Sequence, residues 1–385
     1  MFNNKLTKII ILIIGIIVLT RFYKNKNNRI NKLIDIKNIN KIDFNKSIEE
    51  NVNKSFINAS VVIPVYNCEK TINYSILSIQ NQNLTNLEII LVNDFSTDNS
   101  INIIRDIMKK DTRIKLINNK QNHGTLYSRS IGALSAKGSY IFSLDNDDKF
   151  YGRDSLNFIY NHAIDGNHDI VTFKRIYSRR HHVPKIRSRN INRFSIIHQP
   201  QLSIFPISKR GRFYPNSFFI WDKCIKTSIY KQAVHLLGNE IYDHKISYNE
   251  DIIIVFIIFS ISKSMKIINK HGIIHYIYRT STSRTRKLFY KSQCNIYLLD
   301  ILFRFSKNNN SKNLCVQYFI RNKNFIKRYS SKEDIENLIQ ILNKIMNDKF
   351  ITEKNKQFLK NFIEDMNNQM KNKYILYIIF FKKLE

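Results

Sequence analysis

Three acidic side chains follow a short apolar run in the first half of the chain. Asp145, Asp147 and Asp148 come directly after Tyr140 to Leu144, a stretch typical of a buried strand. Carboxylate oxygens are ligands that Mg²⁺ and Mn²⁺ favour in proteins. The spacing therefore predicts a divalent-metal site at a strand end, with Asp145 and Asp147 as ligands. The sequence contains no GxxxxGK[ST] and no GxGxxG, which argues against a P-loop nucleotidase and a dinucleotide-binding fingerprint.

Apolar runs alternate with helical patterns around this cluster. Strands are expected at 60–66, 87–92, 114–117 and 140–144, and helices at 71–80, 100–110 and 126–136. Such alternation predicts an α/β fold with a mostly parallel sheet and helices on both faces. Ligands bind beyond the carboxyl ends of strands in such sheets, and polar residues follow the expected strands. Those residues are Tyr66, Asn67, Glu69, Asn93, Asp94, Ser96, Asp98, segment 122–129, Asp145, Asn146, Asp147 and Asp148.

The charge of the chain is strongly basic, with 62 Lys and Arg against 30 Asp and Glu and a formal net charge of +32. Clustered basic residues neutralise phosphates, so a nucleic-acid-binding protein is one alternative. Residues 59–165 carry 11 basic and 11 acidic side chains, however, and no nucleic-acid motif is recognised. The basic excess belongs to the flanks, and we expect no nucleic-acid partner. The four cysteines form no CxxC pair, which disfavours a zinc site built on them.

The N-terminal segment contains an apolar run from Ile9 to Leu19. We interpret residues 1–22 as a short membrane anchor and 23–57 as a polar stem. As a helix the run spans only about 17 Å, against a hydrocarbon core of about 30 Å. A single-pass protein of an endomembrane or the plasma membrane is expected, with the orientation left open. Residues 285–385 show helical patterns and form a predicted helical appendage, and whether the last four, KKLE, are a retrieval signal stays open.

Several blocks of the sequence resemble the family-2 glycosyltransferases of the GT-A fold. The blocks are VVIPVYNCEKT, LEIILVNDFSTDNS and NHGTLYSRSIGALSAKGSYIFSLDNDD, in that order. The resemblance implies a Rossmann-like nucleotide-sugar-binding fold, a nucleotide-sugar donor, Mn²⁺ or Mg²⁺, and transfer with inversion at the anomeric carbon. It implies a GT-A domain over 58–284, with a nucleotide-sugar half at 58–150 and an acceptor and catalytic half at 151–284.

The resemblance also suggests roles for single residues of the donor site. Pro64, Tyr66 and Glu69 match positions that line the nucleoside pocket, and Asp94 matches one that meets the uracil or ribose. Arg129 matches an arginine near the base and phosphates. Asp145 and Asn146 complete the implied nucleotide-sugar contacts. Strand termination and core packing are the alternatives for Pro64 and Tyr66, and Gly132 is either a small donor-site position or a close contact between helix and sheet.

The segment ISYNEDIIIVFIIFS resembles the acidic-pair segment of the family, with Glu250 and Asp251 opening an apolar helix. An inverting transfer needs a group that takes the proton of the attacking hydroxyl, and a carboxylate within hydrogen-bond reach can do so. Asp251 matches the family's base, with Glu250 beside it. The alternative is that both acids only complement the positive end of the helix dipole.

Three further residues are weaker candidates. The segment HGIIHYIYRTSTSRT resembles the family's closing segment, which suggests Arg279 as a diphosphate contact and His275 as a metal ligand. A structural histidine is the alternative for His275. Trp221 is a candidate for stacking against an acceptor sugar, although burial is the commoner fate of a single tryptophan.

These observations together predict a metal-dependent inverting glycosyltransferase. It would be a hexosyl- or N-acetylhexosaminyltransferase that moves a sugar from a nucleotide sugar, with a UDP-sugar favoured. The acceptor would be a hydroxyl on a glycan, lipid or protein. The alternatives are an inactive GT-A-fold nucleotide- or sugar-binding protein at a membrane and, less favoured, a basic nucleic-acid-binding protein.

Overall fold

The computed structural model describes residues 57–178, 194–198, 219–243, 245–276, 287–306 and 309–382. Residues 57–385 form one compact unit. The predicted domain boundaries at 150 and 284 are not tested and stay predictions. The strands are β1 Ala59–Val65, β2 Leu87–Asn93, β3 Ile114–Asn118, β4 Tyr140–Ser143, β5 Lys149–Phe150, β6 Ile170–Ser178, β7 Phe194–His198, β8 Lys223–Lys226 and β9 Ser264–Tyr276.

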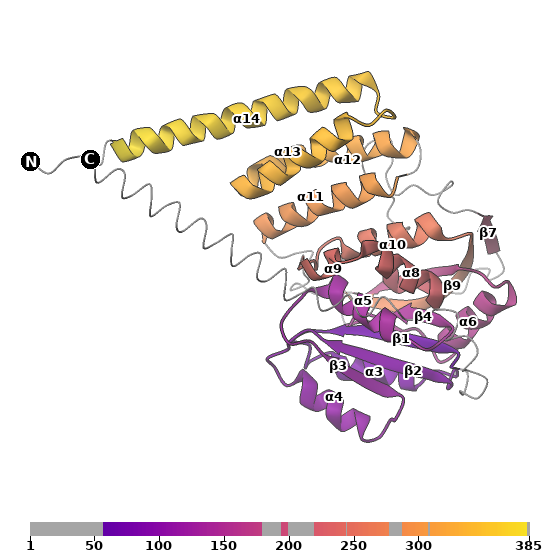
Figure 1. Ribbon diagram of the computed structural model, residues 1–385. Helices are drawn as coiled ribbons and strands as arrows, with labels where there is room; N and C mark the ends of the chain where they lie inside the picture. The colour runs from indigo at the N-terminus through magenta and orange to yellow at the C-terminus, as the bar shows by residue number, and fades with distance from the viewer. Residues whose placement is uncertain are drawn as a thin grey trace, which may run out of the picture. The chain divides into compact units, whose positions relative to one another are not determined.

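A single sheet holds these strands in the order β3-β2-β1-β4-β8-β6-β9-β5, with β7 paired to β9 (Figure 1). The first four strands pair in parallel, and their positions confirm the strands expected from the sequence. Beyond β4 the pairing changes, because β8 runs antiparallel to both β4 and β6. Strands β5 and β7 are antiparallel to β9, whereas β6 and β9 are parallel. The sheet is therefore mixed, which corrects the prediction of a mostly parallel sheet.

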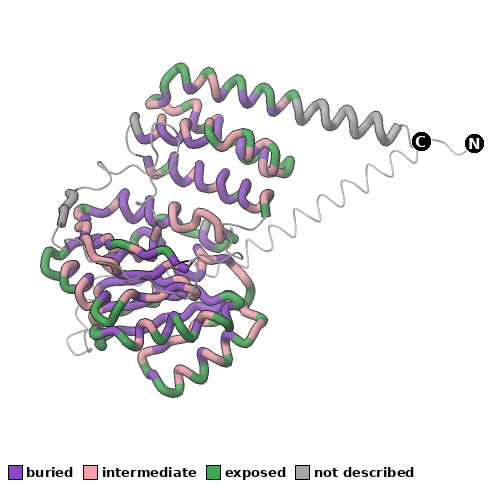
Figure 2. Tube along the Cα trace, turned by 180° about the vertical axis from the view of Figure 1, so that it is seen from behind, coloured by how far each residue is buried: buried purple, intermediate pink, exposed green. Residues whose placement is uncertain are grey.

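Helices cover both faces of the first strands. Every residue of β1 and β2 is buried, and successive side chains of a strand point to opposite faces, so neither face of these strands meets solvent. Figure 2 shows buried residues throughout the sheet, in the helices beside it and in the C-terminal helices. The covering helices are α3 Ile72–Gln80, α4 Ser100–Met108, α5 Thr125–Ser135, α6 Ser155–Asp165, α8 Thr227–Leu237, α9 Glu240–Asp243 and α10 Glu250–Ile261, with a short 3₁₀ turn, η2, at Ile220–Asp222.

Helix α10 links the sheet domain to the C-terminal helices. It is apolar along its length, with all residues from Ile253 to Ser260 buried, because it packs on α5 and α8 on one side and on α11 on the other. The C-terminal helices pack on one another (Figure 1). They are α11 Leu288–Arg304, α12 Asn309–Arg328, α13 Lys332–Met346 and α14 Glu353–Lys382.

The predicted membrane localisation is corrected by the lengths and composition of the helices. Within the described ranges, none of the helices is long and apolar enough to cross a membrane. Residues 1–22, predicted as an anchor, lie outside these ranges. Residues 23–56 of the predicted stem lie outside them as well. A single-pass anchor is therefore not supported.

Gly132 sets how closely α5 approaches the sheet. A β-carbon added there would lie 2.4 Å from Cγ1 of Val62 in β1 and 3.2 Å from Cγ2 of Val92 in β2. The first distance is well below van der Waals contact, so one of the packed elements would have to shift. Gly132 is thus a close helix-to-sheet contact, as one of the two sequence interpretations proposed.

We expect Gly132→Ala to lower the free energy of unfolding by about 1–3 kcal/mol, since overpacking a filled core costs this much. The gain of up to about 1 kcal/mol in helix propensity offsets only part of the loss. Urea denaturation of the variant measures the effect, with Ser135→Ala, an exposed position of the same helix, as the control. An unchanged midpoint for Gly132→Ala would show that α5 does not pack so tightly on β1.

Candidate active site

The loop after β4 is tied to the end of β1. The side-chain amide of Asn146 donates a hydrogen bond to the carbonyl oxygen of Pro64 at 2.8 Å. The Ser75 hydroxyl in α3 donates to the backbone carbonyl of Asn146 at 2.9 Å. Pro64 and Asn146, both predicted donor-site residues, therefore lie side by side, and their bond holds the acidic loop against the nucleoside half of the sheet.

The residues that follow β1 differ in what they offer to a ligand. Tyr66 is 50% exposed, so its ring is available at the carboxyl end of the strand. The Glu69 carboxylate accepts a hydrogen bond from the backbone N–H of Asn99 at 3.0 Å, and the Glu69 N–H donates to Asp98 at 3.0 Å. Glu69 thus joins the loops after β1 and β2, and its nucleoside contact stays a prediction.

Asp94 anchors the loop that leads into α5. Its Oδ1 accepts hydrogen bonds from the His123 N–H at 2.8 Å and the Asn119 amide at 3.0 Å, and its Oδ2 accepts from the Gly124 N–H at 2.8 Å. Gly124 has a φ of 94°, a left-handed conformation that glycine adopts without strain. Asp94 is 4% exposed. This carboxylate therefore shapes the loop of the predicted nucleotide pocket, and its contact with a base or ribose stays a prediction.

Arg129 of α5 joins the two predicted acidic sites. Its side chain is 3% exposed, and Nη2 donates to Oδ1 of Asp145 at 2.5 Å. Nη1 donates to Oε1 of Glu250 at 3.1 Å and also to Oδ1 of Asp251. One guanidinium therefore holds a carboxylate of the predicted metal loop and both carboxylates of the predicted base segment. The predicted contact of Arg129 with nucleotide phosphates is not tested by this arrangement.

The charges in this cluster perturb one another strongly. Burial raises the pKa of the Asp251 carboxyl, and Glu250 and Asp145 raise it further, whereas the Arg129 guanidinium lowers it. Burial also raises the pKa of Glu250. Burial lowers the pKa of Arg129, but the three carboxylates outweigh this effect, and the pKa lies above its ordinary value. Perturbed carboxyls of this kind cluster at functional sites.

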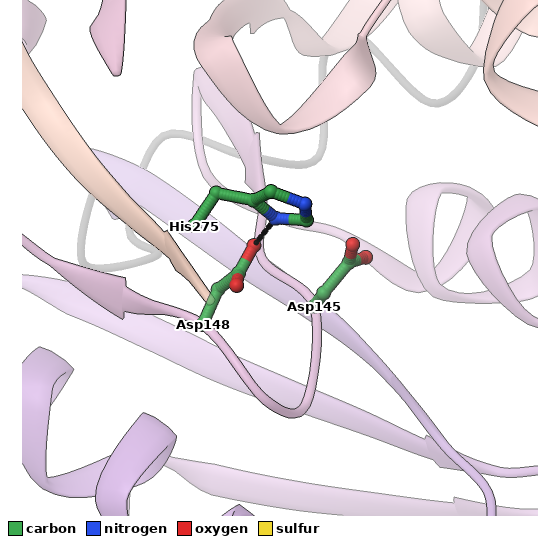
Figure 3. A group of neighbouring side chains, drawn as sticks. All are labelled: Asp145, Asp148 and His275. Atoms are coloured by element: carbon green, nitrogen blue, oxygen red, sulfur yellow. Dashed lines mark hydrogen bonds and ion pairs between the residues drawn. The ribbon is translucent and has the colours of Figure 1, made fainter. Parts of the chain in front are cut away.

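A possible metal-binding group lies beside this cluster (Figure 3). It consists of Asp145, Asp148 and His275, whose ligand atoms all lie within 4.8 Å of one another. Asp145 and His275 were predicted as ligands, and the structure brings them together. Asp147, the third predicted ligand, is not part of this group. Partial burial raises the pKa of Asp147 to about 8, with Asp148 and Asp145 adding to the effect.

Asp148 is fully buried, and both of its oxygens are already engaged. Oδ1 accepts a hydrogen bond from the Tyr276 N–H at 2.9 Å, and Oδ2 lies 2.8 Å from Nδ1 of His275. Burial lowers the pKa of His275, but the hydrogen bond to Asp148 outweighs this and raises it to about 9. Because an ionised carboxylate only accepts, Nδ1 carries the proton of this bond, and Nε2 is the nitrogen that can face a metal ion.

Trp221 is packed between two rings. The indole is 3% exposed, stacks on the His275 ring with centroids 4.7 Å apart and planes at 8°, and stacks on Phe219 at 4.8 Å and 29°. Both faces are therefore covered by side chains. The predicted stacking of Trp221 on an acceptor sugar has no support in this arrangement, whereas its contact with His275 fixes the plane of the imidazole.

Arg279, the last predicted site residue, lies outside the described residues. Asp148 is adjacent to the predicted ligand Asp147 in the sequence, but no role was predicted for it. The sequence signal for such a role was the pair of adjacent acids, Asp147 and Asp148. Adjacency alone does not distinguish a metal ligand from a residue that orients a ligand.

Comparison with known proteins identifies the sheet domain. Residues 60–226 match the family model described as glycosyl transferase family 2. The chain is 44% identical over 113 residues to an uncharacterized glycosyltransferase of Haemophilus influenzae. The aligned residues make up 29% of this chain and 44% of that protein. It is 27% identical over 283 residues to a cholesterol galactosyltransferase of Borreliella burgdorferi. This alignment covers 69% of this chain and 74% of that protein. The chain thus spans less than half the length of the first of these relatives.

Solved structures show the same fold. S. aureus TarS residues 1–349, crystallised with UDP, aligns with a TM-score of 0.54 and 15% identity, over 80% of this chain and 87% of that chain. The form crystallised with UDP-GlcNAc aligns with a TM-score of 0.55 and 14% identity, over 83% and 92% of the two chains. At this identity the likeness concerns the fold alone. The match to the family model and the glycosyltransferase relatives lead to one conclusion: residues 60–226 of this chain form a domain that matches glycosyl transferase family 2.

Proposed function

We propose that this protein is a metal-dependent, inverting glycosyltransferase that moves a sugar from a nucleotide sugar to an acceptor hydroxyl. The observation that carries the proposal is the hydrogen bonding of Arg129. Its guanidinium joins Asp145 of the acidic loop to Glu250 and Asp251 at the start of α10. The predicted donor side and the predicted base therefore belong to one partly buried cluster around the buried Arg129, although they lie far apart in the sequence.

Asp251 is the proposed general base. Its carboxylate would take the proton of the acceptor hydroxyl as the hydroxyl oxygen attacks the anomeric carbon, and the bond from that carbon to the diphosphate oxygen would break. Arg129 supports this role because it holds the carboxylate in place and opposes the effect of burial on the pKa of Asp251. Glu250 shares Nη1 of Arg129 and fixes the guanidinium from a second side.

The donor atoms beside this cluster suit a divalent cation. Carboxylate oxygen and imidazole nitrogen fit Mn²⁺ and, with more oxygen ligands, Mg²⁺. Asp145 and Nε2 of His275 are the proposed protein ligands, with Asp147 adjacent, and Asp148 orients the imidazole as buried carboxylates do for other metal-bound histidines. A cation held there would supply positive charge for the diphosphate leaving group.

The donor that we favour is a UDP-sugar. Support comes from Tyr66, an exposed ring at the carboxyl end of β1, and from TarS, a protein of the same fold that was crystallised with UDP and with UDP-GlcNAc. The relative from Borreliella burgdorferi is a galactosyltransferase, so hexosyl and N-acetylhexosaminyl donors both belong in a test. The acceptor would be a hydroxyl on a glycan, lipid or protein.

We expect the full-length chain to release UDP from one or more of a panel of UDP-sugars when Mn²⁺ is present. Asp251→Asn removes the proposed base while keeping the shape of the side chain. It should lower kcat by at least about 100-fold, because general base catalysis contributes about 10²–10⁴-fold. Affinity for UDP should change little. Coupled detection of UDP and equilibrium binding of UDP measure the two quantities.

The matched control is Glu333→Gln, which changes an acidic residue in the first turn of α13. If Glu250 and Asp251 only complement a helix dipole, Asp251→Asn should resemble this control and keep its kcat. Retained turnover in Asp251→Asn would therefore remove Asp251 as the base. Binding of UDP without turnover of any donor in the wild type would favour the inactive nucleotide-binding alternative.

A second expectation concerns Asp148 and the proton of His275. An asparagine at 148 keeps the oxygen that accepts from Tyr276, but its amide donates to Nδ1, so the proton moves to Nε2 and occupies the lone pair that would bind a metal ion. We expect Asp148→Asn to weaken Mn²⁺ binding about 10- to 100-fold, as loss of an orienting carboxylate does in other metal sites. Titration calorimetry with Mn²⁺ alone measures this without turnover.

Asp169→Asn is the control for that experiment. Asp169 is also buried and accepts a hydrogen bond from the Lys263 N–H at 2.6 Å. It immediately precedes β6, whereas His275 pairs with Tyr177 near the other end of that strand. Mn²⁺ affinity should therefore stay at the wild-type value. Equal Mn²⁺ affinity in Asp148→Asn and Asp169→Asn would contradict the assigned role of Asp148.

A further inference from the structure

The residue before the acidic pair has an unusual backbone. Asn249 adopts a left-handed conformation, with φ 60° and ψ 15°, directly before Glu250 at the start of α10. Asparagine tolerates this region better than most residues, but it is sparsely populated and persists when the surroundings fix it. An asparagine in this position often caps its own helix. Here its amide instead bonds to α11, and the first turn of α10, which the structure describes completely, gets no side-chain cap from it.

The partner of Asn249 is Asn295 in the C-terminal helices. Oδ1 of Asn295 accepts a hydrogen bond from the Asn249 amide at 2.9 Å and another from the Tyr318 hydroxyl of α12 at 2.9 Å. Asn295 is 6% exposed and Tyr318 is 2% exposed. Losing this acceptor removes a hydrogen bond from the buried Tyr318 hydroxyl and from the partly buried Asn249 amide, and the loss of a partner for a buried polar group is costly. The chain Tyr318–Asn295–Asn249 therefore fixes the start of α10 from two C-terminal helices.

The loop before Asn249 is held from both sides. The Ser247 N–H donates to the Tyr290 hydroxyl of α11. On its other side, the Ser247 hydroxyl accepts from the Thr125 N–H at 3.0 Å, and the Ile246 carbonyl accepts from the Leu126 N–H at 3.0 Å. Thr125 and Leu126 begin α5, which carries Arg129. One loop thus sets the position of the acidic pair relative to the arginine that holds it.

We propose that Asn295 is a positioning residue for the proposed base, so that the C-terminal helices are part of the catalytic unit. Asn295 acts through Asn249: it keeps the left-handed turn that aims Glu250 and Asp251 at Arg129. This inference rests on the proposed function for its kinetic consequence. Its structural consequence, a fixed start of α10, does not depend on turnover.

The test compares Asn295→Leu with Asn355→Leu in the full-length chain. Asn355 of α14 is 7% exposed and donates to Oδ1 of Asn313 in α12 at 2.8 Å, a similar buried bond between C-terminal helices that does not involve the 246–249 loop. We expect both variants to lower the thermal midpoint by similar amounts. Only Asn295→Leu should speed amide hydrogen exchange at residues 247–252. In turnover, kcat should fall about 10- to 100-fold, as misplacing a catalytic group does, with the KM for the donor unchanged.

Asn249→Gly supplies a second variant that needs no change in the core, since glycine accepts the left-handed turn and only the amide is lost. It should reproduce the exchange and kcat effects of Asn295→Leu, and the double variant should be no worse than either single change.

Hydrogen exchange at 247–252 that is unchanged in Asn295→Leu, or raised equally in Asn355→Leu, would overturn the positioning role. If the wild type turns over no donor, the proposed function fails while the exchange comparison still decides this inference. If exchange rises in Asn295→Leu while kcat stays at the wild-type value, the catalytic part of the proposal is overturned.

Discussion

A buried guanidinium that faces three carboxylates is the interaction around which the site is built. Removing ions from water is expensive, and the cost is offset only when the partners are close and well aligned. The ion pairs of Arg129 therefore form only if α5, the loop after β4 and the start of α10 keep fixed positions relative to one another. Gly132 permits the close approach of α5 to the sheet, and the loop before Asn249 joins α5 to α10. The same contacts stabilise the fold and arrange the carboxylates.

The first half of the fold could be predicted from sequence because its signals are local. Strands β1 to β4 are apolar runs separated by helical patterns, and each run is long enough to be recognised. The second half of the sheet could not, because β8 is only Lys223–Lys226, with two lysines in four residues, and its place between β4 and β6 depends on pairing with distant strands. The mixed sheet follows from these long-range pairs, which no periodicity in the sequence reveals.

Residue types and strand-end positions indicated which residues belong to the site. The hydrogen-bond partners of these residues could not be predicted from the sequence. Asp145, Glu250 and Asp251 were singled out from the sequence, whereas their bonds to Arg129 were not, and the bonds to Glu250 and Asp251 join residues 121 and 122 positions apart. Asp148 and His275 are 127 positions apart, so the orienting role of Asp148 could not be foreseen. Trp221 could not be assigned either, because composition does not show which rings cover an indole. Asn295 gave no signal, since its role depends on a helix that carries no catalytic motif.

Arg129 acts as the counter-ion of the carboxylates, and the unfolding free energy of Arg129→Met, measured between about pH 5 and pH 9, tests this role. Loss of one partner of a buried ion cluster costs about 3–5 kcal/mol when the carboxylates are ionised. Arg129 lowers the pKa of Glu250 and Asp251, so its removal raises their folded-state pKa values further above the unfolded ones. The loss of stability relative to wild type should therefore be small at acidic pH and grow as the pH rises through the wild-type pKa values. A loss of equal size at every pH would mean that Arg129 contributes packing alone and is not the counter-ion of the carboxylates.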